Sequence, residues 1–99
     1  MMNYWLYSGT KEEIEEIYPN INFFGNAKCF YWLDTREDRE SVVIWIDPSD
    51  ERNYSILEHE IFHAVMFTSL ERSLDINHNN DETGAYLFQW LHKNLKDEL

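Results

Sequence analysis

Residues 55–74 of the chain read SILEHEIFHAVMFTSLERSL, a long stretch that predicts a single helix. Asn53 or Ser55 can cap its beginning, because the side-chain oxygen of either residue can accept a hydrogen bond from a free backbone N–H of the first turn. We expect this helix to continue to about Leu74. The fold class then depends on which elements precede and follow this helix.

A second helix is predicted after a short polar loop. The loop, residues 75–80, reads DINHNN, and Asn80 or Asp81 can cap the helix that follows. Lys93 and Lys96 lie near its C-terminus, where positive charge is favourable. Its apolar positions recur at helical spacing; they are Ala85, Phe88, Leu91 and Leu95. The second half of the chain is therefore predicted to be helical.

The first half predicts a small sheet with one helix packed against it. Residues 4–7, 27–33 and 41–46 are rich in the aromatic and β-branched residues that favour strands. The polar stretch DTREDRE, between the last two strands, predicts a β-hairpin with an exposed loop. Thr10 can cap a helix that runs to Tyr18, before a proline. We therefore expect an α+β fold: a small antiparallel sheet of about three strands with an N-terminal helix, followed by the two later helices.

Length and composition are those of one small folded domain, residues 1–99. A hydrophobic content of 43% and an aromatic content of 16% are typical of a packed core rather than of disorder. A domain of this size buries a modest share of its surface, so a bound metal ion would help to stabilise it. The single cysteine, Cys29, has no partner for a disulfide within the chain, and we interpret it as a buried, reduced thiol.

Charge and hydropathy argue against two kinds of partner. A net charge of −11 disfavours binding to a nucleic acid backbone, which requires clusters of Lys and Arg. The sequence shows no secretory signal pattern and no apolar run of roughly 20 residues that could cross a bilayer. We therefore expect a soluble, cytoplasmic protein with no nucleic acid and no membrane partner. The same charge favours cations, including metal ions and basic peptides.

Residues 59–63 read HEIFH, an HExxH motif inside the long predicted helix. Residues i and i+4 lie one above the other on a helix, so both imidazoles can reach one zinc ion at roughly 2.0–2.1 Å. Glu60 is offset by one residue, which places its carboxylate beside the metal, where it can accept a proton from a water molecule. The motif therefore predicts His59 and His63 as zinc ligands and Glu60 as a general base.

A catalytic zinc site also needs a third protein ligand and an open fourth position. Glu82 lies in the first turn of the second helix and reaches the histidine pair if the two helices pack side by side. Its alternative role is to stabilise the N-terminus of that helix. Asp81 and His78 are the other candidate ligands.

Tyr86 and His78 are further candidates for the catalytic site. Tyr86 lies one turn after Glu82, and its hydroxyl can stabilise an oxyanion if it points to the metal. A core tyrosine with a bonded hydroxyl is the alternative interpretation. His78 lies in the loop before Glu82 and can serve in the same way, or be an ordinary solvent-exposed histidine.

The motif and the spacing of these residues resemble those of a known protein family. The HEIFH motif followed by Glu82 is similar to the gluzincin class of zinc metallopeptidases, in which the two motif histidines and a glutamate on the next helix hold the metal. The stretch from Ile56 to Leu91, with LEHEIFHAV and DETGAYLFQWL, also resembles small zincin-like proteins encoded by phages and prophages. The resemblance implies a minimal zincin-like domain in which His59, His63 and Glu82 hold Zn²⁺ and Glu60 is the base.

The resemblance implies a function as well. It is that of a zinc-dependent metallopeptidase, of phage or prophage origin, that hydrolyses a peptide or protein substrate with metal-activated water. In zincin-like folds an edge strand pairs with the extended substrate, and residues 42–46, which precede the HExxH helix, are expected to be that strand. A second interpretation keeps zinc as a structural staple in a non-catalytic protein-binding module.

Overall fold

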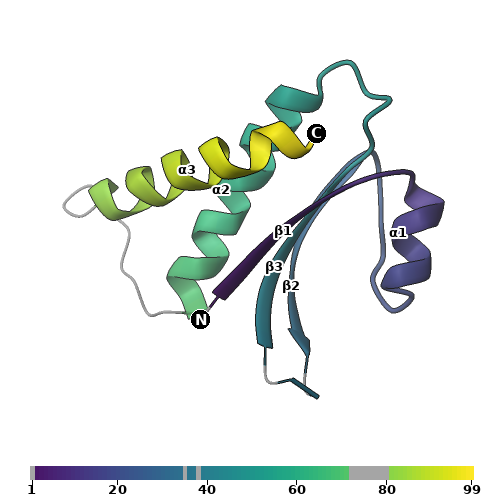
Figure 1. The fold of residues 1–99 in the computed structure, drawn as a ribbon, viewed down its shortest axis with the longest axis horizontal. Helices are drawn as coiled ribbons and strands as arrows, with labels where there is room; N and C mark the ends of the chain where they lie inside the picture. Colours follow the sequence, from purple (N-terminus) through teal and green to yellow (C-terminus); the bar gives the residue numbers. More distant parts are fainter. Residues whose placement is uncertain (1, 35, 38, 72–80) are drawn as a thin grey trace.

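The computed structural model describes residues 2–34, 36, 37, 39–71 and 81–99, without the side chains of residues 71, 81 and 82 (Figure 1). The elements in chain order are β1 (Met2–Ser8), α1 (Lys11–Ile17), β2 (Ala27–Asp34), β3 (Arg39–Ile46), α2 (Asn53–Glu71), α3 (Asp81–Leu95) and the short 3₁₀ helix η1 (Lys96–Glu98). The predicted α+β fold, with an N-terminal helix, the HExxH helix and a C-terminal helix, is confirmed.

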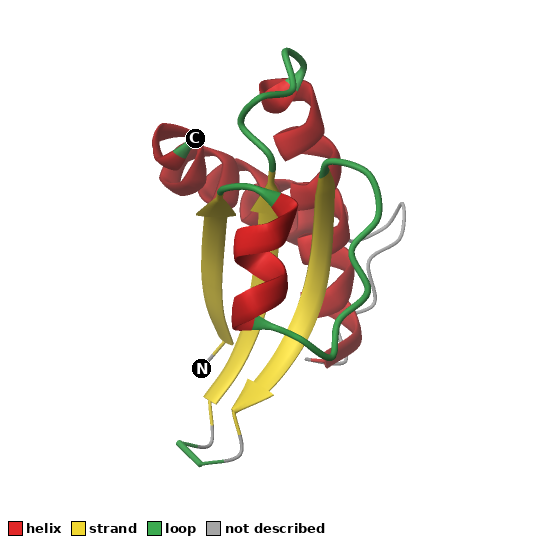
Figure 2. Cartoon of the chain, turned by 90° about the vertical axis from the view of Figure 1, so that its right-hand side faces the viewer, coloured by secondary structure: helices red, strands yellow, loops and turns green. Residues whose placement is uncertain are grey.

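The three strands form one sheet in the order β1-β3-β2. The predicted hairpin is confirmed, because β2 and β3 pair antiparallel. The sheet is mixed, however: β1 pairs with β3 in parallel, where an antiparallel sheet was expected. The cause is the path of the chain, since α1 runs back along the sheet and the segment after it returns to the end at which β1 finished (Figure 2). The hairpin then brings β3 up beside β1 in the same direction.

Helices cover both faces of the sheet. The two long helices α2 and α3 lie on one face, and α1 lies on the other (Figure 1). Successive residues of β3 alternate between the two cores, as the period of a strand requires. The α2–α3 side is built on Met2, Val42, Ile44, Ile46, Leu57, Ile61, Ala64, Val65, Leu91 and Leu95, and the α1 side on Ile14, Phe23, Phe30, Val43 and Trp45.

Local signals placed the helices to within a few residues, although Asn53 and Ser55, the expected caps of the HExxH helix, both lie inside α2. Asn80, an expected cap of α3, lies outside the described residues. Thr10 caps α1 as predicted, because its Oγ1 accepts a hydrogen bond of 3.2 Å from the backbone N–H of Glu13. The HExxH motif lies inside α2, which buries Leu57 and Ile61 against the sheet. In the described part of the chain, no helix combines the length and the apolar character that a membrane crossing requires.

One expectation about the sheet is wrong. Residues 42–46 belong to β3, which is the central strand and is paired on both sides, so they offer no free edge to a substrate. All five residues are buried, as is typical of a strand covered on both faces. The two outer strands are β1 and β2, and of the two β2 packs more extensively against the HExxH helix.

Candidate metal centre

The two histidines of the motif lie side by side on the exposed surface of α2. Their Nε2 atoms are 3.1 Å apart, and the ring planes meet at 75°. Two nitrogen ligands bound to one tetrahedral zinc ion at 2.0–2.1 Å lie roughly 3.3 Å apart. His59 and His63 therefore present their ring nitrogens with almost the separation that a shared metal ion needs.

Glu60 lies between the two histidines in sequence but is buried between α2 and β2. Only 7% of its surface is exposed, whereas both histidines are exposed. Within the described residues its carboxylate has no hydrogen-bond partner. Burial raises the pKa of Glu60, and the nearby His63, His59 and Lys28 oppose that shift. In the described part of the chain no side-chain polar atom that is sealed from solvent lacks a partner, so the Glu60 carboxylate reaches the open hollows beside it. A carboxylate whose pKa is raised by burial and that lies on a groove is a candidate functional group.

Two hollows meet at Glu60, on the groove between α2 and the outer strand β2. The first has a volume of about 290 Å³ and reaches His59. The second has a volume of about 340 Å³ and reaches His63. Ala27 of β2 lines both hollows, as Glu60 does. Glu60 therefore lies on a groove that reaches both histidines and whose opposite wall is the start of β2.

Polar groups that the sequence did not point to surround the first hollow. The Asp50 carboxylate accepts hydrogen bonds from the Nε of Arg52 (3.2 Å) and from the side-chain amide of Asn26 (3.0 Å). These bonds hold the pKa of Asp50 well below its usual range. The three residues join the turn before α2 to the start of β2. The three residues lie far apart in sequence, Asn26 from Asp50 and Arg52, so the sequence did not single out this cluster.

Cys29 lies in the second hollow rather than deep in the core. It is partly buried, and burial, followed by the charge of the Glu60 carboxylate, raises its pKa well above the usual range. A thiol with a raised pKa stays protonated at neutral pH and is a poor nucleophile. The residue therefore acts as part of the groove wall, next to Glu60 and His63.

The structure brings two of the three predicted ligands together and does not describe the third. In the residues whose side chains are placed, no group of three or more His, Cys, Asp or Glu could hold a metal ion. Glu82 and Asp81 lie in the first turn of α3, but their side chains are outside the described part, as is His78. Glu82 therefore remains a predicted ligand, with Asp81 and His78 as its alternatives.

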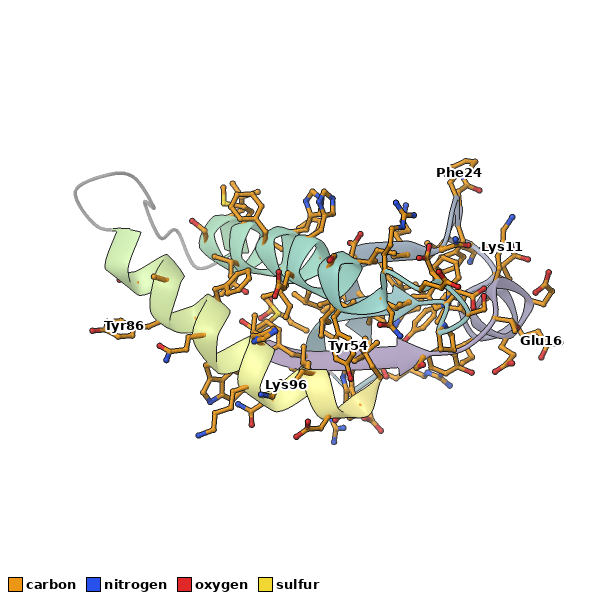
Figure 3. All side chains as sticks on the ribbon, turned by 90° about the horizontal axis from the view of Figure 1, so that it is seen from above. Lys11, Glu16, Phe24, Tyr54, Tyr86 and Lys96 are labelled. Carbon is orange, nitrogen blue, oxygen red and sulfur yellow. The ribbon has the colours of Figure 1, made fainter. Side chains whose placement is uncertain are left out.

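Tyr86 is not placed at the histidine pair. Its side chain is 67% exposed and points outward from α3 (Figure 3). Its hydroxyl has no hydrogen bond to another described residue. In this arrangement the phenol lies in solvent, and the structure gives no support to a role for it beside the metal.

Comparisons with known proteins add no family. No protein-family model, no curated protein and no solved structure matches the chain. The candidate centre therefore rests on the motif and on the geometry of His59, Glu60 and His63.

Proposed function

We propose that this protein is a minimal zinc-dependent metallopeptidase of the gluzincin type, of phage or prophage origin, that hydrolyses a peptide or protein substrate. One observation carries the proposal: the 3.1 Å approach of the His59 and His63 Nε2 atoms, with Glu60 on the groove that reaches both histidines. An HExxH sequence can occur by chance, and the placement of these three side chains supports the proposal beyond the motif itself.

His59, His63 and Glu82 would hold the ion, in a set of two nitrogens and one carboxylate oxygen that suits zinc. A bound zinc ion lowers the pKa of a coordinated water toward about 7 and polarises a substrate carbonyl. Three protein ligands leave a fourth position open to solvent, which is the arrangement of catalytic sites. The exposure of both histidines on α2 is consistent with such access.

Glu60 would be the general base. Its carboxylate faces both hollows, so it can take a proton from a water molecule in the groove and return it to the leaving amine. Burial raises its pKa, which improves its ability to give the proton back, and the nearby His63, His59 and Lys28 oppose that shift.

The outer strand β2 would position the substrate. It is an outer strand of the sheet, and its first residues, Ala27, Lys28 and Cys29, line the groove opposite Glu60. An extended peptide can pair with the edge of such a strand through main-chain hydrogen bonds, which align it without a demand on its sequence. We therefore assign to β2 the substrate-pairing role that was predicted for residues 42–46.

The test is a hydrolysis assay with casein and a panel of unstructured peptides, using protein purified without chelator. Glu60→Gln preserves size but removes the proton acceptor, so turnover should fall by roughly 10²–10⁴-fold while the zinc content stays at one ion. Glu51→Gln is the matched control, because Glu51 is an exposed acid just before α2 and lines neither hollow. It should leave turnover unchanged. A wild type that holds zinc yet is as inert as Glu60→Gln would establish the non-catalytic binding module instead.

A further inference from the structure

The other outer strand, β1, also has a free edge. In the described part of the chain its backbone pairs only with β3, through seven consecutive register pairs without a bulge. Its sequence, MNYWLYS, contains neither proline nor a charged residue. Proteins usually protect an outer strand with these features, because unpaired N–H and C=O groups invite another strand. The edge of β1 lacks them.

A groove runs along this edge. It has a volume of about 480 Å³ and is bounded by the start of β1 and by the end of α3 with η1; its lining residues are Met2, Asn3, Tyr4, Trp90, Asn94, Leu95 and Glu98. Trp90 and Asn94 lie one turn apart on the same stripe of α3, and Glu98 lies in η1. Trp90 is 54% exposed and meets the ring of Tyr4 edge-on, with 6.0 Å between the ring centroids.

The opposite face of the same edge carries a second exposed tryptophan. Tyr4 is paired with Val42 on the α2–α3 side of the sheet, whereas Trp5 is paired with Val43 on the α1 side. Trp5 is 57% exposed. A strand added to β1 would send alternate side chains to the two faces, one set against Tyr4 and Trp90 and the other against Trp5. Exposed tryptophans of this kind are typical anchors of interfaces.

Charge indicates what such a strand would carry. Glu98 is the charged residue among those that line the groove, and no Lys or Arg is among them. The chain as a whole has 19 acidic and 8 basic residues. A Lys or Arg on the incoming segment could pair with Glu98 or lie over a tryptophan ring. A second copy of this chain would instead bring another charge of −11 and the same uncharged edge.

We propose that the edge of β1 is a docking site for an extended, positively charged segment of a partner protein, which adds to the sheet as its fourth strand. The site is distinct from the histidine pair, because β1 and β2 lie on opposite sides of β3. Docking of a strand at β1 requires neither a zinc ion nor catalysis. The interaction would hold a partner at one side of the sheet while the β2 groove stays open.

The experiment uses a fluorescein-labelled heptapeptide, KVKVKVK, and its acidic counterpart EVEVEVE, with the His59→Ala variant so that no metal chemistry interferes. Binding is followed by fluorescence anisotropy, and hydrogen exchange reports which strand is protected. We expect KVKVKVK to bind at least about tenfold more tightly than EVEVEVE and to slow exchange at the amides of β1. Protection of β2 instead of β1 would overturn the proposal.

Two peptide controls isolate main-chain pairing. Successive N–H groups of a strand point to opposite sides, so one peptide is N-methylated on its valines and the other on its lysines. Pairing with β1 requires that one of them loses binding while the other keeps most of it. Equal binding by both would show that the peptide does not add as a strand.

Three variants of the protein locate the site. Trp90→Ala should weaken KVKVKVK binding by roughly tenfold, and Phe24→Ala, an exposed aromatic on the β2 groove, should leave it unchanged. Glu98→Lys, at an exposed position of η1, should weaken KVKVKVK and strengthen EVEVEVE, a result that a folding defect would not give. Light scattering completes the test: a dimer that Trp90→Ala dissociates would show that the occupant is a second copy.

Discussion

The two outer strands of this sheet, β1 and β2, have similar backbone positions at its edges but different neighbouring helices. Among the described residues, both β1 and β2 pair with β3 alone, which leaves one backbone edge of each strand unpaired. Beside β2 runs the HExxH helix, which supplies two imidazoles and a buried carboxylate. Beside β1 run the end of α3, which supplies a tryptophan and an amide, and η1, which supplies an exposed acid. A free edge can recognise an extended chain in either place, but among the described residues it is the groove at β2 that holds the imidazoles and the carboxylate to which we assign the metal and the proton.

The largest expected effect removes the metal from the β2 side. His59→Ala or His63→Ala should abolish stoichiometric zinc binding, because a pair of nitrogens is reduced to one. A ligand present at 100 times its dissociation constant stabilises the native state by about 2.7 kcal/mol. For a domain of this size that corresponds to a loss of roughly 10–20 °C in melting temperature under such zinc concentrations.

Metal analysis and thermal melting with and without zinc measure this effect. His92→Ala is the matched control, since His92 lies on α3 with its Nε2 3.7 Å from a carboxylate oxygen of Glu58. It should retain zinc. Purified wild type that holds no zinc, and whose melting does not respond to added zinc, would contradict the metal centre.

The next effect concerns the third ligand. Glu82→Gln should lower zinc affinity by roughly 10–100-fold or more, whereas Asp81→Asn should change it little. The two residues are adjacent in the first turn of α3, which makes each the control for the other. Isothermal titration with zinc distinguishes them, and a reversed pair of results would identify Asp81 as the ligand.

A smaller effect follows from the burial of Glu60. Burial raises the pKa of Glu60 in the folded protein above its value in the unfolded chain. The protonated carboxyl therefore contributes fully to the stability of the metal-free fold at pH values below the unfolded-state pKa. That contribution is lost as the pH rises through the folded-state pKa. The metal-free Glu60→Gln variant should therefore be more stable than wild type at pH 7. Denaturant unfolding at a series of pH values checks the sign: the difference should shrink as the pH is lowered, and a difference independent of pH would show that Glu60 is not buried in solution.

The smallest effect tests whether the two edges are independent. The Tyr4 hydroxyl forms a hydrogen bond of 2.7 Å with Thr68 of α2, across the core between β1 and the HExxH helix. Tyr4→Phe should lower the free energy of unfolding by about 1 kcal/mol and leave zinc affinity unchanged. If Tyr4→Phe lowered zinc affinity as well as stability, the β1 side would set the position of the metal-binding helix, and the two edges would be coupled.

The amino-acid sequence alone determined the elements and the motif. Strands, hairpin and helices follow from local periodicity and caps, such as Thr10 before α1, because these depend on residues a few positions apart. The placement of His59 and His63 on one helix face follows in the same way, since i and i+4 spacing needs no tertiary contact.

Only the tertiary structure decided which edges are free and what faces them. The direction of β1 depends on the path of the chain through α1, and this made β3, with residues 42–46, the central strand rather than the edge. The burial of Glu60 against β2 and the outward position of Tyr86 likewise depend on how helices pack on the sheet. Such contacts join residues far apart in sequence, and their energies depend on all the neighbours at once, so no local pattern specifies them.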